Sequence, residues 1–232
     1  MGLEAETGRG ARGTDADERH TAVVTGGASG LGRAFCHLLA AHGYRAVIVD
    51  TDGPGAETVA AEIRESNGCA EARIADVTSW TAVQGIAADM QAREWLPSLL
   101  VLCAGDVHVG ALAEIEDLSG VRRDIEVDLW GAIVCCHCFG PLLAPGSQVL
   151  MISSGFGLFG AAGYAGYCAA KAGLIHFAEG LRRELLYRRV HVHVACPGDM
   201  DTPMYRRELA QQPGWMKTAS ARYLVKSPED VA

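Results

Sequence analysis

The sequence has no long apolar run: nowhere in its 232 residues do about 18 or more apolar residues follow one another, so we expect no membrane span. It is also short of basic residues, with 20 Lys and Arg against 28 Asp and Glu and a formal net charge of −8. A chain this acidic has no general attraction for nucleic acid or for an anionic membrane surface.

The first residues of the chain do not have the pattern of a signal peptide. Residues 1–19 are rich in glycine and charge and have no apolar signal-peptide core, so we expect a disordered leader. Most of the eight cysteines lie in apolar runs, as small hydrophobic residues do in a reducing compartment, and we expect a cytoplasmic protein. Near the end, Ser227 and Pro228 have the pattern of a helix start, which predicts that the sequence continues beyond Ala232.

Short apolar segments alternate with helical patterns along the chain. The expected strands are 21–25, 46–49, 72–75, 99–102, 148–152 and 190–195, and the expected helices are 31–42, 56–65, 81–93, 118–139 and 167–186. Strands without a polar face indicate a parallel sheet covered by helices on both sides. We find no internal repeat or linker, so residues 20–232 are predicted to form one α/β domain with a doubly wound parallel sheet, the Rossmann fold.

A glycine-rich turn joins the first expected strand to the first expected helix. Glycines let the backbone approach a pyrophosphate, and the helix start supplies N–H groups and a positive dipole. Glycine-rich turns without a ligand are common, but this one has the strand–turn–helix context that a dinucleotide site requires. The expected cofactor contacts in the turn are Gly26, Ser29, Gly30, Leu31 and Gly32.

Asp50 ends the second expected strand, where an acid can accept hydrogen bonds from the ribose 2′- and 3′-hydroxyls. The same carboxylate would repel a 2′-phosphate, so NAD(H) is predicted over NADP(H). The nearest cations are Arg33 and Arg45, and neither is obviously placed to bind that phosphate. The alternative is that Asp50 is an acid on a surface turn.

Tyr167 and Lys171 are four residues apart on an expected helix and so share a face. An ammonium near a tyrosine stabilises the phenolate and lowers the hydroxyl pKa, which suits proton exchange with a substrate oxygen. Ser154 follows an expected strand, at the end of the sheet where ligands of such folds bind.

These residues resemble the short-chain dehydrogenase/reductase family. The matching segments are the 25–32 turn, Asp76-Val77, Ala104-Gly105, Ser154 thirteen positions before Tyr167, Lys171, and Cys196-Pro197-Gly198 leading to Thr202. The resemblance runs from residue 21 to about residue 203 and resumes at 227–232.

The resemblance implies roles for these residues. Tyr167 would be the general acid/base, Ser154 would hydrogen-bond the substrate oxygen, and Lys171 would bind the nicotinamide ribose and lower the Tyr167 pKa. The other cofactor contacts implied are Asp76 and Val77 at the adenine, Pro197, Gly198 and Thr202 at the carboxamide, and Ala104, Gly105 and Met200.

Two positions depart from the family pattern. Cys103 replaces the Asn that usually precedes Ala-Gly, and Asp128 replaces a fourth catalytic residue, an Asn that helps to hold a water joined to the lysine. A charge at Asp128 would partly cancel the field of Lys171, which predicts a weaker acid at Tyr167 and an activity optimum at higher pH. The alternative is that Asp128 substitutes for Asn with little effect.

Two other patterns have structural interpretations. Cys135, Cys136 and Cys138 surround a histidine, but no second ligand pair is evident, so core packing is expected and no metal site is predicted. His191 and His193 alternate with valines on a strand, which favours a partly buried, hydrogen-bonded pair.

The resemblance also bears on partners. In this family the helix at 167–186 commonly packs against a second subunit, which implies a homodimer or homotetramer; burial within one chain is the alternative. Its broad apolar face carries Ala169, Ala172, Phe177 and Leu181.

The substrate is expected to be a hydrophobic alcohol or ketone. Large apolar groups gather in the variable 204–225 segment and near the site, namely Met204, Tyr205, Leu209, Trp215, Met216, Tyr223, Leu224, Phe156, Leu158, Phe159 and Tyr164. The sequence thus predicts an NAD(H)-dependent oxidoreductase that interconverts a secondary alcohol and a ketone. The alternatives are an NADP-dependent reductase of a lipid-like ketone and a dinucleotide sensor without catalysis.

Overall fold

The computed structural model describes residues 20–214 and 225–232. The leader expected at 1–19 lies outside the described residues, as do Trp215, Met216, Tyr223 and Leu224 of the variable segment.

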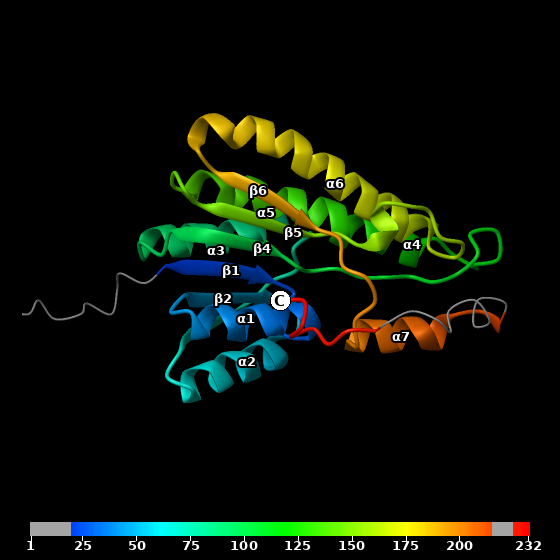
Figure 1. The fold of residues 1–232 in the computed structure, drawn as a ribbon, viewed down its shortest axis with the longest axis horizontal. Coiled ribbons are helices and arrows are strands. Elements are labelled where there is room, and N and C mark those ends of the chain that lie inside the picture. Colours follow the sequence, from blue (N-terminus) through cyan, green and yellow to red (C-terminus); the bar gives the residue numbers. More distant parts are fainter. Residues whose placement is uncertain (1–19, 215–224) are drawn as a thin grey trace, which may run out of the picture.

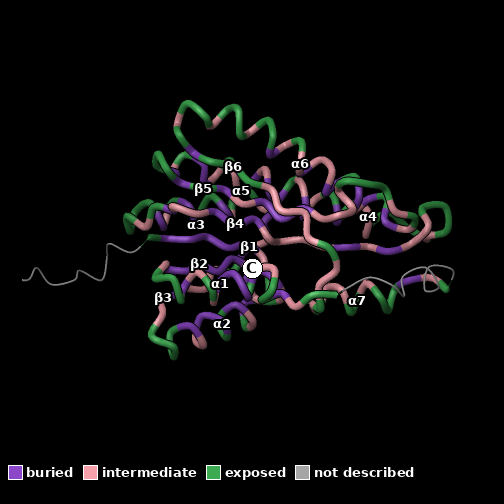
Figure 2. The backbone as a smooth tube through the Cα atoms, viewed as in Figure 1, coloured by how far each residue is buried: buried purple, intermediate pink, exposed green. Residues whose placement is uncertain are grey.

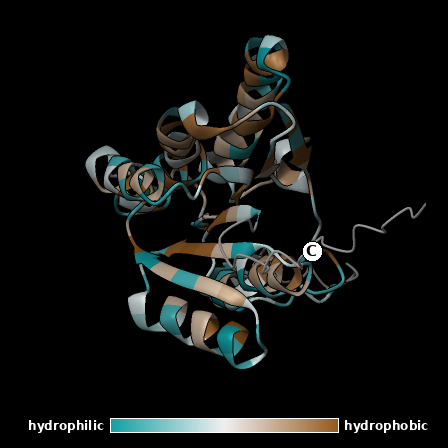
Figure 3. Ribbon diagram, turned by 90° about the vertical axis from the view of Figure 1, so that its left-hand side faces the viewer, coloured by the Kyte–Doolittle hydropathy of each residue, from teal (hydrophilic) through white to brown (hydrophobic). Residues whose placement is uncertain are grey.

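Six parallel strands form one sheet in the order β3-β2-β1-β4-β5-β6. The strands are β1 (Thr21–Thr25), β2 (Arg45–Asp50), β3 (Cys69–Ile74), β4 (Pro97–Leu102), β5 (Gln148–Ile152) and β6 (His191–Ala195). Each expected strand forms, and the doubly wound parallel sheet is confirmed. The central strands are buried because both of their faces are covered, as at Val23, Ile48 and Leu100. Figure 3 shows how hydrophilic and hydrophobic residues are distributed over this fold.

Helices cover both faces of the sheet, α1 and α2 on one side and α3, α5 and α6 on the other (Figure 1). The helices are α1 (Gly30–Ala41), α2 (Gly53–Glu65), α3 (Trp80–Ala92), α4 (Ser119–Ile125), α5 (Gly131–Phe139), α6 (Ala165–Leu185) and α7 (Pro203–Gln211). Two buried apolar clusters result, one on each side of the sheet. Phe177 and Leu181 of α6 pack against this chain's own core, whereas Ala169 is exposed.

The expected helix at 118–139 is not regular. A π-helical segment, η1 (Glu126–Trp130), separates α4 from α5, and Asp128 lies at its centre. Such wide turns cannot be read from hydrophobic spacing, because the apolar pattern continues across them. On α5, Cys135 is buried, and Cys136 and Cys138 pack against the core, as expected from the sequence.

By length and composition, the helical stretch Ser119–Leu142 is the one candidate for a membrane span among the described residues. Over half of its apolar window, 56%, is buried inside the fold, and the stretch carries Asp128 in the interior. A helix in the core of a globular protein can have the same length and composition, so this stretch is weak evidence for a membrane span.

The structure corrects the interpretation of His191 and His193. Both side chains are exposed, whereas Val192 between them is buried. Val192 belongs to the buried cluster that includes residues of α6, so its two neighbours on β6 face the other side of the sheet, where these positions are exposed. Figure 2 shows buried and exposed positions along the backbone.

The expected helix start near Ser227 is a single turn in the structure, with the Ser227 hydroxyl accepting a hydrogen bond from the Asp230 N–H. Val231 and Ala232 pack on the core cluster beside α1, at the same end of the sheet as the carboxyl ends of the strands.

Strand order reverses at β1, which has β2 on one side and β4 on the other. The loops that follow β1 and β4 therefore leave in opposite directions and open a crevice beyond the sheet, where ligands of such folds bind. The Thr25 hydroxyl closes the bottom of this crevice by accepting hydrogen bonds from the N–H groups of Cys103 and Ala104.

Candidate active site

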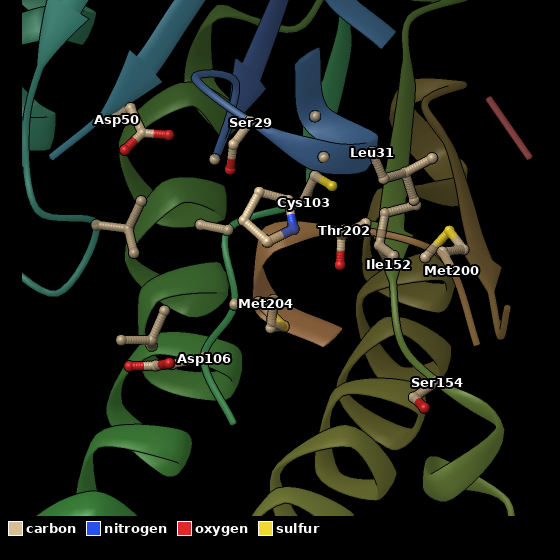
Figure 4. A pocket seen from close by; sticks show the side chains of 18 of the residues that line it. Ser29, Leu31, Asp50, Cys103, Asp106, Ile152, Ser154, Met200, Thr202 and Met204 are labelled. Atoms are coloured by element: carbon tan, nitrogen blue, oxygen red, sulfur yellow. The ribbon is translucent and has the colours of Figure 1, made fainter. Parts of the chain in front are cut away.

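The crevice is a cavity of about 360 Å³, within the range of small-molecule sites. It runs from Asp50 and Ser29 at one end to Ser154 and Asp106 at the other (Figure 4). Every cofactor-binding residue predicted from the sequence lines it: Gly26, Ser29, Gly30, Leu31, Gly32, Asp50, Asp76, Val77, Ala104, Gly105, Tyr167, Lys171, Pro197, Gly198, Met200 and Thr202. Asp128 does not line the cavity but lies behind Lys171.

Two glycines of the turn after β1, Gly26 and Gly32, have no room for a side chain. Gly26 has a φ of +68°, and a Cβ atom there would lie 2.8 Å from the Ala104 Cα. A Cβ atom on Gly32 would lie 2.1 Å from the Gly26 carbonyl oxygen. Ser29 precedes α1 without capping it through its side chain, so the first N–H groups of α1 are available to an anionic ligand in the cavity.

Asp50 is fixed by the backbone around it. Its Oδ2 accepts a hydrogen bond from the Ala28 N–H at 3.0 Å, and its Oδ1 accepts one from the Asp52 N–H at 2.9 Å. The carboxylate thus joins the glycine turn to the end of β2 and faces the same cavity, in the position where a ribose would lie beside a bound pyrophosphate.

Asp76 forms a cluster with Thr78 and Arg123 that the sequence does not predict. Its Oδ1 accepts hydrogen bonds from the N–H and hydroxyl of Thr78, and Arg123 of α4 donates to its Oδ2 at 3.1 Å. Burial works against the ionised form, but these donors outweigh it and hold the pKa of Asp76 below its usual value. Arg123 also lines the cavity, so it brings a positive charge to the wall beside Asp76.

The three predicted catalytic residues lie together at the other end of the cavity. Ser154 follows β5 and begins a short 3₁₀ turn, η3 (Gly155–Gly157), in which the Phe156 N–H donates to its hydroxyl at 3.1 Å. Tyr167 and Lys171 project from the first turns of α6. The buried Ser153 hydroxyl donates to the Lys171 carbonyl at 2.9 Å and so fixes α6 against the end of β5.

Lys171 is held by a buried ion pair. Its Nζ lies 2.8 Å from Asp128 Oδ1 and donates to the Ile152 carbonyl at 3.0 Å, and the two side chains are 5% and 0% exposed. Gly105 packs directly on this pair, because a Cβ atom there would lie 2.6 Å from Asp128 Oδ1. Burial alone would lower the pKa of Lys171, but the Asp128 charge outweighs it and the pKa is raised.

The sequence predicts a lowered pKa for the Tyr167 hydroxyl, but the structure gives a raised one. Burial raises its pKa first, Lys171 lowers it, and Asp128 raises it again, so that the net pKa lies above the ordinary value. A hydrogen bond from Ser154 acts in the lowering direction. Lys171 therefore acts as predicted, but its field is countered by burial and by its own ion-pair partner.

We therefore expect Asp128→Asn to move the activity profile to lower pH. Removing the negative charge leaves Lys171 to stabilise the phenolate, so alcohol oxidation, which needs the phenolate, should rise at a lower pH than in the wild type. The measurement is kcat for alcohol oxidation against pH in both proteins. If the two pH profiles are identical, the charge of Asp128 does not affect the Tyr167 pKa, and Asp128 simply replaces the family's Asn.

Helix α7 crosses the substrate end of the cavity and is attached on two sides. Arg207 pairs with Asp106 from the loop after β4, and Glu208 accepts a hydrogen bond from the Tyr164 hydroxyl at 2.6 Å. The two residues of the first contact are 101 positions apart in the sequence, and those of the second are 44 positions apart. No local pattern in the sequence indicates either contact.

The apolar residues expected around the substrate divide into two groups. Phe156 packs edge-on against Tyr167, and Met204 and the buried Tyr164 belong to the same apolar cluster. Leu158 and Phe159, in contrast, are 68% and 61% exposed, although the Phe159 ring still contacts Phe156 edge-on. Tyr205 and Leu209 lie on α7, where neither is fully buried.

One crevice holds both a dinucleotide-binding turn and a Ser-Tyr-Lys catalytic set. This combination defines a dehydrogenase of the doubly wound α/β class. The family model of the short chain dehydrogenases matches residues 20–213. The chain belongs to this family, and the secondary alcohol or ketone is the functional group on which it acts.

Curated relatives include dehydrogenases of ring alcohols. The chain is 34% identical over 188 residues to 2,5-dichloro-2,5-cyclohexadiene-1,4-diol dehydrogenase from Sphingobium indicum, covering 79% of this chain and 74% of the relative. It is 32% identical over 220 residues to cis-4-hydroxycyclohexanecarboxylate dehydrogenase from Sinomonas cyclohexanicum, covering 94% and 88%.

Solved structures have the same fold. A dehydrogenase/reductase from Sinorhizobium meliloti superposes with a TM-score of 0.80 at 26% identity, covering 91% of this chain and 84% of the other. A protein from Beutenbergia cavernae, assigned as an NAD(P)-dependent gluconate 5-dehydrogenase and holding NADP at low occupancy, has a TM-score of 0.80 at 27% identity, covering 93% and 88%.

Proposed function

We propose that this protein is an NAD(H)-dependent dehydrogenase that interconverts a cyclic secondary alcohol and its ketone. The observation that carries the proposal is the single cavity that has Asp50 and the glycine turn at one end and Ser154, Tyr167 and Lys171 at the other. The cofactor, when bound, accepts or supplies the hydride. The chain's own residues bind it, orient the substrate and exchange the proton.

The catalytic residues have distinct tasks in this proposal. The Ser154 hydroxyl hydrogen-bonds the substrate oxygen, and Tyr167 takes a proton from it during oxidation or donates one during reduction. Lys171, fixed by Asp128 and the Ile152 carbonyl, supplies the positive field that stabilises the Tyr167 phenolate. Met204 gives the substrate end an apolar side, and Phe156 packs edge-on against the Tyr167 ring.

The preference for NAD(H) is supported by where the nearest cations lie. Arg33 is engaged by Glu62 of α2 at 2.8 Å. Arg45 begins β2, five residues before Asp50, which is roughly 16 Å away at about 3.3 Å per residue, and its guanidinium stacks on Trp95. The two arginines that line the cavity among the described residues, Arg123 and Arg207, are paired with Asp76 and Asp106. A 2′-phosphate beside Asp50 would therefore meet a fixed carboxylate and no unpaired arginine of the described cavity wall.

The first test is a pair of fluorescence titrations of the purified protein with NADH and NADPH. We expect NADH to bind at least about tenfold more tightly, since burying a carboxylate against a phosphate costs well over 1.4 kcal/mol. Asp50→Asn, which removes the charge and keeps the shape, should reduce this preference. Tighter binding of NADPH would overturn the cofactor assignment, and binding of neither would overturn the dinucleotide site.

The two ring-alcohol relatives support a ring substrate. Each is named for a six-membered ring with a hydroxyl, and Ser154 and Met204 line the same end of the cavity. We therefore expect oxidation of cis-4-hydroxycyclohexanecarboxylate, 1,4-cyclohexanediol or cyclohexanol with NAD⁺, measured as NADH absorbance. Turnover of long-chain lipid ketones alone would contradict the ring assignment but not the class of reaction.

We also propose that the protein is a cytoplasmic homodimer or homotetramer. The exposed Ala169 on α6 and the exposed Trp130 and Ile125 on the neighbouring helices offer an apolar surface for a second copy. Sedimentation of the purified protein tests this, and a monomer at micromolar concentration would contradict it.

A further inference from the structure

The substrate end of the cavity carries one ion pair that the proposed chemistry does not use. Arg207 of α7 and Asp106 of the loop after β4 are paired, and both line the cavity together with Ser154, Tyr167 and Met204. Asp106 and Ser154 lie on opposite sides of this end (Figure 4). A substrate whose reacting oxygen lies at Ser154 therefore presents its far side to the ion pair.

The acid of this pair is held in place by hydrogen bonds of the backbone. The Asp106 N–H donates to Asp128 Oδ2 at 3.3 Å, and Asp106 Oδ1 accepts a hydrogen bond from the Val107 N–H at 3.0 Å. Asp128 is itself paired with Lys171, so Asp106 is fixed relative to the catalytic residues. A group that is already ordered binds a ligand without the entropic cost of being ordered by it.

Some polar atoms of the pair remain available. The contact uses Nη2 of Arg207 and Oδ1 of Asp106, whereas Nη1 and Nε of Arg207 and Oδ2 of Asp106 have no partner among the described residues. Both side chains are partly exposed, so a ligand in the cavity can reach them. The pair thus offers N–H donors and a carboxylate acceptor side by side.

A hydroxyl group matches this arrangement of donors and acceptor. Because a hydroxyl has one donor proton and two acceptor lone pairs, it can donate to Asp106 and accept from Arg207 at once. A carboxylate only accepts and would meet the Asp106 charge, and a methyl group does neither. Hydrogen bonds to charged groups are stronger than those between neutral groups. The ion pair therefore favours a second hydroxyl over an apolar or anionic group at this position.

The balance of charge also disfavours an anionic substrate. Each cation of the described cavity wall has a carboxylate of its own: Arg207 pairs with Asp106, Lys171 with Asp128, and Arg123 with Asp76. The pKa of Tyr167 is raised first by burial and further by the charges of Asp128 and of Glu208, which follows Arg207 on α7. An anion would find no uncompensated positive charge here, whereas a neutral hydroxyl needs none.

We propose that Arg207 and Asp106 form a subsite for a second hydroxyl, so that the substrate is a neutral cyclic diol. One hydroxyl reacts at Ser154 and Tyr167, and the other, on the opposite side of the ring, donates to Asp106 and accepts from Arg207. Met204, three residues before Arg207 on the same face of α7, supplies the apolar contact for the ring carbons. The inference rests on the proposed function and adds the class of substrate.

The first arm of the test measures binding and needs no turnover. Calorimetric titration of the NADH complex compares 1,4-cyclohexanediol with 4-methylcyclohexanol, in which a methyl group of similar size replaces the second hydroxyl. An alcohol cannot react with NADH, so both complexes are stable. For the better-bound isomer of each, we expect the diol to bind at least about tenfold more tightly, since a site that hydrogen-bonds a hydroxyl rejects the analogue that lacks it. Equal affinities, or no binding of the diol, would overturn the proposal.

The second arm measures kcat/KM for oxidation of the same two alcohols with NAD⁺ in the wild type and in Arg207→Met. Methionine keeps much of the apolar stem of arginine but has no N–H donor. The substitution should lower kcat/KM for the diol about tenfold, mostly through KM, and change that for 4-methylcyclohexanol less than about twofold. A merely structural role for Arg207 would lower both alike, because a displaced α7 affects either substrate, and equal losses would overturn the subsite.

The matched control is Arg206→Met. Arg206 precedes Arg207 on α7, but it pairs with Asp201 at the surface and does not line the cavity. Its loss should change kcat/KM for both alcohols less than about twofold, and a loss confined to the diol would overturn the assignment to Arg207. If Arg207→Met does not fold, Asp106→Asn removes the charge of the acid and keeps its shape, and should lower the ratio of kcat/KM between the diol and 4-methylcyclohexanol several-fold.

The outcomes in the wild type separate the two proposals. A protein that binds NADH but oxidises neither cyclohexanol nor the two test alcohols would overturn the proposed function. A protein that oxidises cyclohexanol but has the same kcat/KM for the diol and 4-methylcyclohexanol would overturn only the diol subsite. A higher kcat/KM for cis-4-hydroxycyclohexanecarboxylate than for the diol would mean that Arg207 binds an anion, and would overturn the neutral substrate.

Discussion

Tyr167→Phe should lower kcat about 1000-fold for both oxidation and reduction. The substitution removes the one hydroxyl that lies beside Ser154 and Lys171 and is able to exchange a proton with the substrate oxygen, and general acid–base catalysis of this kind contributes roughly 10²- to 10⁴-fold. The ring remains to pack against Phe156, so the fold and the cofactor site should be preserved. The measurement is steady-state turnover together with NADH titration.

Tyr164→Phe is the matched control for this prediction. Tyr164 lies one helical turn earlier, but its hydroxyl is bound to Glu208 and Gln212 and does not line the cavity. Its loss should change kcat by no more than a few-fold. Retention of more than about a tenth of wild-type turnover in Tyr167→Phe, with NADH binding intact, would mean that another group exchanges the proton.

Asp128→Ala should destabilise the folded protein by about 3–5 kcal/mol. The change removes one partner of a buried ion pair and leaves the Lys171 ammonium, 5% exposed, without a counter-charge. The free energy of unfolding in urea at pH 7 measures this loss. Asp201→Ala, which breaks the exposed pair with Arg206, should cost less than about 1 kcal/mol.

A double variant separates the cost of an orphaned charge from the value of the pair. Asp128→Leu with Lys171→Met replaces both charges by apolar groups and should be more stable than Asp128→Ala alone, although it should be inactive. If Asp128→Ala unfolds at the same urea concentration as the wild type, Lys171 is compensated by another group and the ion pair is not what holds it.

Much of this molecule follows from local sequence patterns. The apolar segments gave the six strands within a few residues, since strands buried on both faces tolerate few polar residues, and the glycine turn and Asp50 were placed by their position after a strand. Tyr167, Lys171 and Ser154 were found because their spacing on the chain is fixed by one helix and one strand end.

The interactions that modify the site could not be found in this way. The Arg207–Asp106 and Arg123–Asp76 pairs join distant segments, and the ion pair of Asp128 depends on how η1 packs against α6. The sequence indicated that Asp128 was unusual but did not indicate that Asp124, four residues earlier, is buried as well. His191 and His193 were assigned wrongly because alternation along a strand does not reveal which face a helix covers.

The two attachments of α7 respond differently to the solution around them. Arg207 and Asp106 are 52% and 36% exposed, so dissolved ions screen their attraction, whereas the Tyr164–Glu208 hydrogen bond involves a tyrosine that is almost fully buried. Added salt therefore weakens the contact of α7 with the loop after β4 and spares its contact with α6. The helix that crosses the substrate end is thus attached by one contact that depends on ionic strength and by another that does not.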